Sequence, residues 1–120
     1  MTSASNGSAG AIARDGVLST IQRDVEAIDG VTWAKVTYAD NAAVDHGATV
    51  GFEVDSAERL TPAAQAIAGL LWRSSLTPLR SMSVWGSVGG EDPRVNDFYR
   101  LSDTETIRRL TEQFGPRPAN

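Results

Sequence analysis

Two segments in which polar and apolar residues alternate constrain the fold of this chain more than any other feature. They cover residues 32–39 and 48–55. The apolar sides consist of Ala34, Val36 and Tyr38 in the first segment and of Val50, Phe52 and Val54 in the second. Because successive side chains of a β-strand point to opposite faces, this alternation predicts two strands that each bury one face. The polar residues 40–47 between them predict the loop of a β-hairpin.

Two segments with helical spacing flank this hairpin. In residues 11–29, apolar residues recur three or four positions apart, and Gly30 follows where the pattern ends. A second helix is predicted after either Ser56 or Thr61, both of which are suitable caps, and it extends to about Ser74.

The remainder of the chain predicts one more strand and one more helix. Residues 81–88 alternate again, with Trp85 on the polar side. Ser102 and Glu105 have the spacing of a capping box, which predicts the start of a C-terminal helix that ends at Gly115.

These elements predict an α+β fold. The sheet has three strands, either mixed or antiparallel, with two helices on one face in α-β-β-α-β order, and a C-terminal helix is added. A length of 120 residues favours a single domain, which we expect to cover residues 12–115. Residues 1–11, which are rich in Ser and Gly, are predicted to be a flexible tail, and residues 116–120 a second tail.

The sheet face away from the two helices carries the most informative side chains. Trp33 and Trp85 both fall on it, and Gly51 is predicted to lie between them. The C-terminal segment supplies apolar residues that could cover this face, namely Phe98, Tyr99, Leu101, Ile107, Leu110 and Phe114. We therefore expect the C-terminal segment to fold across it, since burying a tryptophan is worth several kcal/mol. The alternatives are that a second copy or a partner protein meets this face, or that it forms a ligand groove.

Composition removes several classes of function. The formal net charge is −4 and no basic patch stands out, which argues against nucleic acid as a partner. The chain has no cysteine, and no apolar run approaches the ~20 residues that span a bilayer. The single histidine, His46, has no defined set of metal co-ligands, and Gly89-Gly90 is not followed by the Lys-Ser/Thr of a phosphate loop. We expect no metal, no cofactor and no enzymatic activity.

One stretch of the chain resembles a known family. The sequence GATVGFEVDSAERLTPAAQAIAGLLW, with AIDGVTWAKV before it, is similar to the strand and alanine-rich helix of BON domains. The resemblance covers residues 17–88, although Gly51 is displaced from the family's second glycine and the C-terminal helix is additional. It implies a non-enzymatic module of the bacterial envelope that binds phospholipid surfaces or other envelope components.

The sequence as a whole predicts a non-catalytic binding domain of a bacterial secreted or cell-envelope protein. Its partner is another protein, a second copy of the chain or a membrane-surface component. The candidate binding residues are Trp33, Trp72, Arg73, Arg80 and Trp85. The alternatives are a small enzyme or ligand carrier that uses His46 or surface arginines, a self-assembling structural protein, and a cytoplasmic address.

Overall fold

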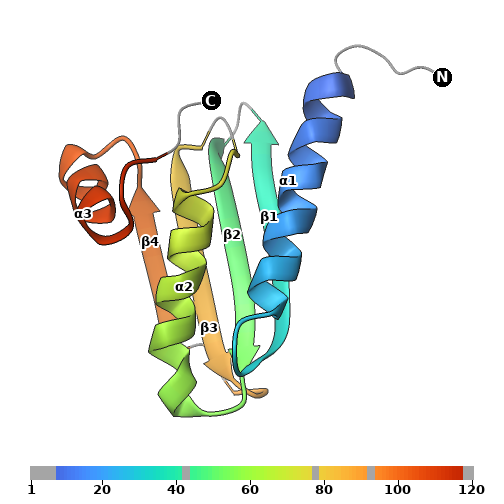
Figure 1. Cartoon of the computed structure of the whole chain (residues 1–120), viewed down its shortest axis with the longest axis vertical. Coiled ribbons are helices and arrows are strands. Elements are labelled where there is room, and N and C mark those ends of the chain that lie inside the picture. The colour runs from blue at the N-terminus through green and yellow to red at the C-terminus, as the bar shows by residue number, and fades with distance from the viewer. Residues whose placement is uncertain (1–7, 42–43, 77–78, 92–93, 118–120) are drawn as a thin grey trace.

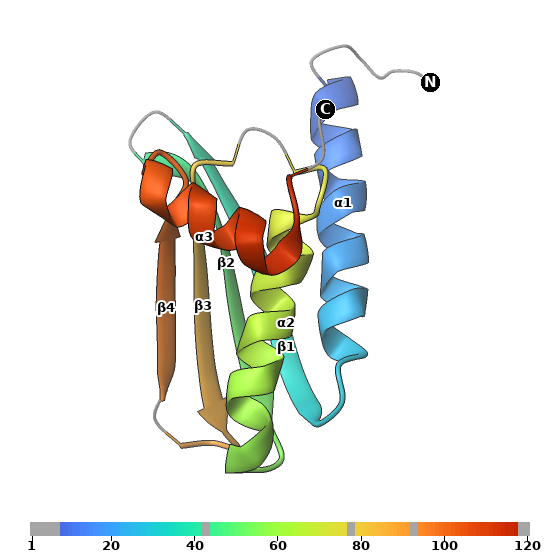
Figure 2. The same ribbon diagram turned by 60° about the vertical axis from the view of Figure 1, so that its left-hand side comes forward.

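The computed structural model describes residues 8–41, 44–76, 79–91 and 94–117, without the side chains of residues 8–14, 40, 41 and 44–46. The fold is α+β, and the helices of this part of the chain lie on one side of a four-stranded sheet (Figures 1 and 2). The elements in chain order are α1 (Ser8–Glu26), β1 (Val31–Asn41), β2 (Val44–Val54), the short 3₁₀ helix η1 (Ala57–Arg59), α2 (Leu60–Trp72), β3 (Ser81–Val88), β4 (Val95–Arg100) and α3 (Thr104–Phe114). The predicted α+β class is confirmed. The sheet has four strands, whereas three were predicted.

β1 and β2 form the predicted hairpin, but their strands are longer than predicted. The antiparallel ladder runs from the Val31–Val54 pair to the Asn41–Val44 pair, with irregularities near both ends. The prediction of a loop over residues 40–47 is therefore wrong for most of that segment. Ladder bonds join backbone groups, so polar side chains at the end of a hairpin do not stop the pairing. Residues 42–43 lie outside the described part of the chain.

The core lies between the sheet and the two long helices. β2 and β3 are parallel neighbours, and α2 is the crossover that connects them. Fully buried side chains from strands and helices meet here, among them Phe52, Val84, Ile67, Leu71 and Val25. A Cβ placed on Gly86 of β3 would lie only 2.4 Å from Cζ of Phe52, so the aromatic ring fills the space above that glycine.

β4 is the strand that the sequence analysis misses. It pairs antiparallel with β3 and forms one edge of the sheet, in the order β1-β2-β3-β4. Its sequence, VNDFYR, places Phe98 and Tyr99 side by side, so one aromatic ring goes to each face and no apolar alternation results. A mostly exposed edge strand needs no apolar side, which is why period-two patterning does not reveal it.

α3 does not cover the sheet face that carries Trp33 and Trp85, so that prediction is wrong. It lies on the helix side, where the ring of Phe114 contacts Gly69 of α2. Figure 2 shows α3 running from the end of β4 to the C-terminal end of α2. Because Gly69 has no side chain, the Phe114 ring packs directly against the backbone of α2. This contact keeps α3 on the helix side of the sheet.

The residues after α3 continue this contact. The Trp72 indole Nε1–H donates to the Gly115 carbonyl oxygen at 2.7 Å. The guanidinium group of Arg117 donates to the carbonyls of Leu71 and Trp72 at the end of α2 and of Leu76 just after it. Leu71 and Trp72 belong to the last turn of α2, where carbonyls lack intrahelical partners, and Leu76 lies in the segment that follows. Arg117 therefore packs against the domain, although the sequence analysis places it in a tail.

The starts of two helices also differ from the predictions. The N-cap of α3 is Asp103 rather than Ser102, and its carboxylate accepts from the Thr106 N–H at 3.0 Å and from the Thr106 hydroxyl at 2.8 Å. α1 begins at Ser8, within the segment assigned to the N-terminal tail.

Candidate functional site

The strongest candidate for a functional surface is the sheet face opposite the helices, which we call the aromatic sheet face. No helix of the described residues lies on it (Figures 1 and 2). The register places on it Trp33, Lys35 and Thr37 of β1, Thr49, Gly51 and Glu53 of β2, Ser81, Ser83, Trp85 and Ser87 of β3, and Asn96, Phe98 and Arg100 of β4. This face therefore combines three aromatic rings with small hydroxyl side chains.

Trp33 and Trp85 flank Gly51 as the alternation predicts. Gly51 pairs with Trp85 across the β2–β3 ladder, and the Cβ position of Gly51 lies 3.6 Å from Cζ3 of Trp33. The Trp33 ring therefore leans over the backbone of β2. Trp33 keeps 50% of its surface exposed and Trp85 keeps 44%. Both indoles stand on the side of the sheet that nothing in the described part of the chain covers.

Phe98 extends this aromatic surface to the edge strand. It is 57% exposed and pairs with Ser83, two residue pairs from the Trp85–Asn96 pair and on the same face. The guanidinium carbon of Arg100 lies 6.0 Å from the centre of the Phe98 ring, a cation–π distance. The sequence analysis misses Phe98 as a surface residue because it misses β4. The β3–β4 register, and not an alternation in the sequence, places Phe98 on this face.

Charged groups of both signs border the aromatic rings. Lys35 lies beside Gly51, and Glu53 lies opposite Trp33 in the β1–β2 ladder. Arg100 lies at the other edge of the sheet. The hydroxyls of Thr32 and Thr37 are directed at backbone carbonyls of β2, at 3.4 Å each. Apolar rings inside a mixed polar border are typical of protein interfaces.

The remaining predicted binding residues lie elsewhere. Trp72 is only 3% exposed, so the hypothesis that it is an exposed contact residue is wrong. Its ring faces Arg117, whose guanidinium carbon is 5.9 Å from the ring centre. Arg73 is exposed on the helix side, over the Phe114 ring at 5.6 Å. Arg80 is exposed just before β3, where its carbonyl accepts from the Leu101 N–H.

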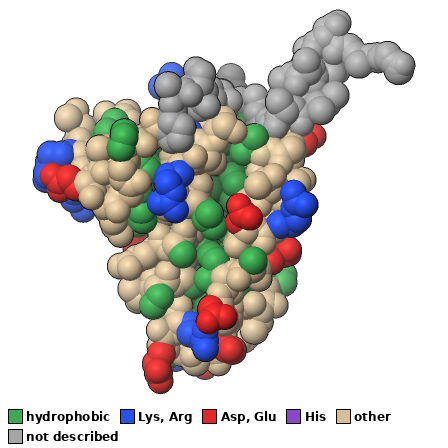
Figure 3. Space-filling view, in the orientation of Figure 1, with side chains coloured by type: hydrophobic (Ala, Val, Ile, Leu, Met, Phe, Trp, Pro, Cys, Tyr) green, Lys and Arg blue, Asp and Glu red, His purple; other side chains and the backbone are tan. Residues whose placement is uncertain are grey.

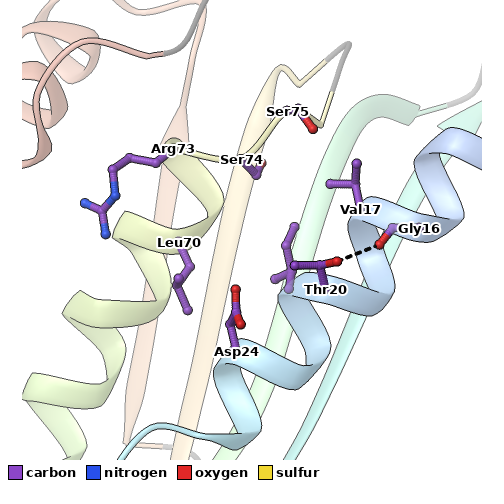
Figure 4. A pocket seen from close by; sticks show the side chains of 9 residues that line it. Gly16, Val17, Thr20, Asp24, Leu70, Arg73, Ser74 and Ser75 are labelled. Atoms are coloured by element: carbon purple, nitrogen blue, oxygen red, sulfur yellow. Dashed lines mark hydrogen bonds between the residues drawn. The ribbon is translucent and has the colours of Figure 1, made fainter.

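A pocket of about 480 Å³ opens between α1 and α2. Apolar side chains lie along this seam on the helix side (Figure 3). Val17 and Leu70 face the space, whereas the Arg73 guanidinium points away from α1 (Figure 4). The Thr20 hydroxyl donates to the Gly16 carbonyl of α1, and the Ser74 hydroxyl donates to the Leu71 carbonyl of α2. Asp24 also lines the pocket and points into it (Figure 4), but the Thr20 and Ser74 hydroxyls donate to carbonyls and not to its carboxylate.

Tyr99 is a titrating group of β4 whose pKa is shifted. Burial raises the pKa of Tyr99, the charge of Asp97 adds to this, and the charge of Arg109 opposes it. Tyr99 therefore stays protonated at neutral pH. Among the described residues, no group of three or more His, Asp or Glu side chains has the geometry of a metal site. His46 belongs to β2, and its side chain lies outside the described part of the chain.

Among the described residues, none of the helices has the length and apolar character needed to cross a membrane. In comparisons with protein-family models, curated proteins and solved structures, nothing matches this chain.

Proposed function

We propose that this chain is a non-catalytic binding domain that recognises another protein through the aromatic sheet face. The observation that carries the proposal is the exposure of Trp33, Trp85 and Phe98 on one face of the sheet. Apolar surface removed from water stabilises a complex by roughly 25 cal/mol per Å². Trp is also among the residues that contribute most to binding at protein interfaces.

The shape and charge of this face favour a protein over the other partner classes. Small-molecule sites are concave, whereas these rings stand on the open side of a sheet. Adhesion to an anionic membrane surface needs clustered cations, and the chain has a formal net charge of −4. A flat surface with central aromatic rings and charges of both signs around them fits a folded protein partner.

The cellular address is a separate part of the proposal. The resemblance to BON domains supports a bacterial secreted or cell-envelope protein. Fractionation of the producing cells tests this address, since the proposal requires the chain in the envelope or medium fraction and recovery from the cytoplasm alone would contradict it.

The binding proposal is tested by site-specific photocrosslinking. A photoreactive phenylalanine analogue replaces Trp85 in one sample and Arg73, which is exposed on the helix side, in a matched sample. Both are irradiated in extracts of the producing cells, and crosslinked proteins are identified by mass spectrometry. We expect a defined protein at position 85 that is absent at position 73.

The identified protein is then purified and titrated with three forms of the chain. We expect the Trp33→Ser/Trp85→Ser variant to bind at least about tenfold more weakly than the wild type, because it loses both indoles. The Arg73→Ser variant should bind with unchanged affinity. Equal affinities for the wild type and the double variant, with both folded by circular dichroism, would refute the assignment of this face.

A further inference from the structure

The two edges of the sheet differ in how their outward backbone groups are satisfied. At β1, Gln22 of α1 donates from Nε2 to the Ala34 carbonyl at 2.7 Å and accepts the Val36 N–H at Oε1 at 2.8 Å. One residue of a neighbouring parallel strand would make the same two bonds. The amide of Gln22 therefore occupies the place of an added strand and protects this edge.

The outer edge of β4 has no such protection within the described residues. The Leu101 N–H bonds to Arg80 and the Arg94 N–H bonds to Gly86, both on the β3 side. The Leu101–Arg80 bond continues the regular β3–β4 register, so the backbone groups of residues 96, 98 and 100 point outward, whereas the Arg94–Gly86 bond lies one residue outside that register. Of these outward groups, the Arg100 carbonyl accepts from the Asp103 N–H, and no other bond to them is found in the described part of the chain. Free edge groups of this kind are a template for another strand.

α3 presents an exposed apolar residue close to this open edge. Leu110 and Phe114 pack against the core, and Ile107 lies three and seven positions before them on the same helical stripe. Ile107 nevertheless remains 38% exposed. The N-terminal end of α3 lies near the end of β4, and the helix runs from there towards α2 (Figure 2). The stripe therefore leaves one apolar side chain exposed in the half of α3 that begins near β4.

We propose that β4 pairs with β4 of a second copy of this chain, antiparallel about a two-fold axis at Phe98. The two four-stranded sheets would join into one continuous sheet with both sets of helices on the same side. Ile107 of each copy would then cover the added strand of the other. This proposal rests on the sheet edge and does not depend on the partner proposed for the aromatic sheet face.

Charge favours this register over the neighbouring antiparallel register centred on Asp97. Centring the pair on Asp97 would place two aspartates directly opposite each other, which destabilises a sheet. Centring it on Phe98 places Asn96 opposite Arg100 and Asp97 opposite Tyr99. Asp97 thus disfavours the register centred on itself and allows the register centred on Phe98.

Arg109 supplies a complementary charge for the selected register. It lies close enough to Tyr99 to affect the pKa of that side chain. It makes no salt bridge with any residue of the described part of the chain. In the proposed pair, Asp97 of the second copy lies directly across from Tyr99 and so comes near Arg109. Each dimer would gain two such ion pairs by symmetry.

Sedimentation equilibrium of the full chain over a concentration series tests the proposal. We expect a mass that rises with concentration to twice that of the monomer and no further. Asn96→Pro removes an outward N–H without removing a bond to β3, and it should raise the dimer dissociation constant at least about tenfold. Asn96→Ala, which keeps the N–H, is the matched control and should dimerise like the wild type.

A charge exchange separates a specific contact from a loss of folding. Arg109→Glu and Asp97→Arg should each weaken the dimer, and the Asp97→Arg/Arg109→Glu double variant should restore it. A wild-type chain that remains monomeric at millimolar concentration would overturn the proposal. So would a dimer that Trp33→Ser/Trp85→Ser abolishes while Asn96→Pro leaves it intact, because that result assigns the contact to the aromatic sheet face.

Discussion

At the scale of single residues, Gly86 gives the sharpest prediction. An added Cβ would lie 2.4 and 2.6 Å from two ring atoms of Phe52 and 3.0 Å from Leu60 Cδ1. Because Phe52 is buried and cannot leave its site, Gly86→Ala should lower the free energy of unfolding by about 1–3 kcal/mol. Urea denaturation followed by circular dichroism measures this change.

Two comparisons identify the cause of that loss. Gly90 has no atom within 4 Å of its Cβ position, so Gly90→Ala should change stability by less than about 0.5 kcal/mol. Replacing Phe52 by Leu removes the clashing ring atoms. Gly86→Ala should therefore lower the free energy of unfolding less in the Phe52→Leu background than in the wild type. Equal costs in the two backgrounds would show that Phe52 is not the obstacle.

Arg117 is the second residue with a measurable contribution. Its guanidinium donates to two carbonyls at the end of α2 and to one just after it, and burial lowers its pKa. Hydrogen bonds to charged groups contribute about 1.5–3 kcal/mol, so Arg117→Ala should destabilise the domain by about that amount. Arg94→Ala breaks only an exposed ion pair with Glu91 and should cost at most about 0.5 kcal/mol in the same chemical denaturation. Similar costs for both variants would argue against a specific role for Arg117.

At the scale of elements, the edge of β1 depends on one side chain of α1. Gln22→Leu removes both bonds to Ala34 and Val36, so the Val36 amide should exchange with solvent about tenfold faster or more. Hydrogen exchange followed by NMR gives this rate for each amide. Gln22→Glu keeps an acceptor for the Val36 N–H and should protect it better than Leu does. Unchanged exchange at Val36 in the Leu variant would show that the edge is closed by other means.

The start of α3 makes stability depend on pH. Hydrogen bonds from the Thr106 hydroxyl, and then from its backbone N–H, lower the pKa of Asp103 below the ordinary value of 3.8. A carboxyl with a depressed folded-state pKa stabilises the fold above its unfolded-state pKa, and this is lost as the pH falls through the folded-state pKa. Asp103→Ala should therefore reduce stability at pH 7, and the difference from the wild type should shrink below about pH 3.8.

Urea denaturation of the wild type and Asp103→Ala at both pH values measures this dependence. Ser102→Ala is the control, because Ser102 precedes the N-cap and should matter little. A difference that does not vary with pH would exclude the carboxylate as its source.

Local patterns predict most elements of this fold but not all of their partners. Alternation around Val36 and Phe52 predicts the hairpin because one face of each strand is buried. β4 lacks this signal, since an edge strand is held by backbone bonds that leave no trace in the side chains. The position of α3 depends on how Phe114 fits Gly69, which are far apart in the sequence. The two tryptophans of the site were thus predictable, whereas the absence of a cover and the contribution of Phe98 were not.

At the scale of the whole molecule, the three tryptophans report on opposite sides of the sheet. Trp33 and Trp85 are exposed, whereas Trp72 is buried under the C-terminal residues. The Trp33→Phe/Trp85→Phe variant should emit at shorter wavelength and resist acrylamide quenching. The Trp72→Phe variant should emit at longer wavelength and be quenched readily. Protection of Trp85 in a chain shown to be monomeric would contradict the open face.

The contact between α2 and the residues after α3 also has a kinetic consequence. The Trp72–Gly115 bond joins positions 43 residues apart, so it closes a long loop of chain. Closing such a loop costs entropy before any contact is gained, so we expect the bond to form after the main barrier to folding has been crossed. Weakening it would then accelerate unfolding and leave the refolding rate nearly unchanged. The last part of the chain to be synthesised would thus set how long the folded molecule persists rather than how fast it folds.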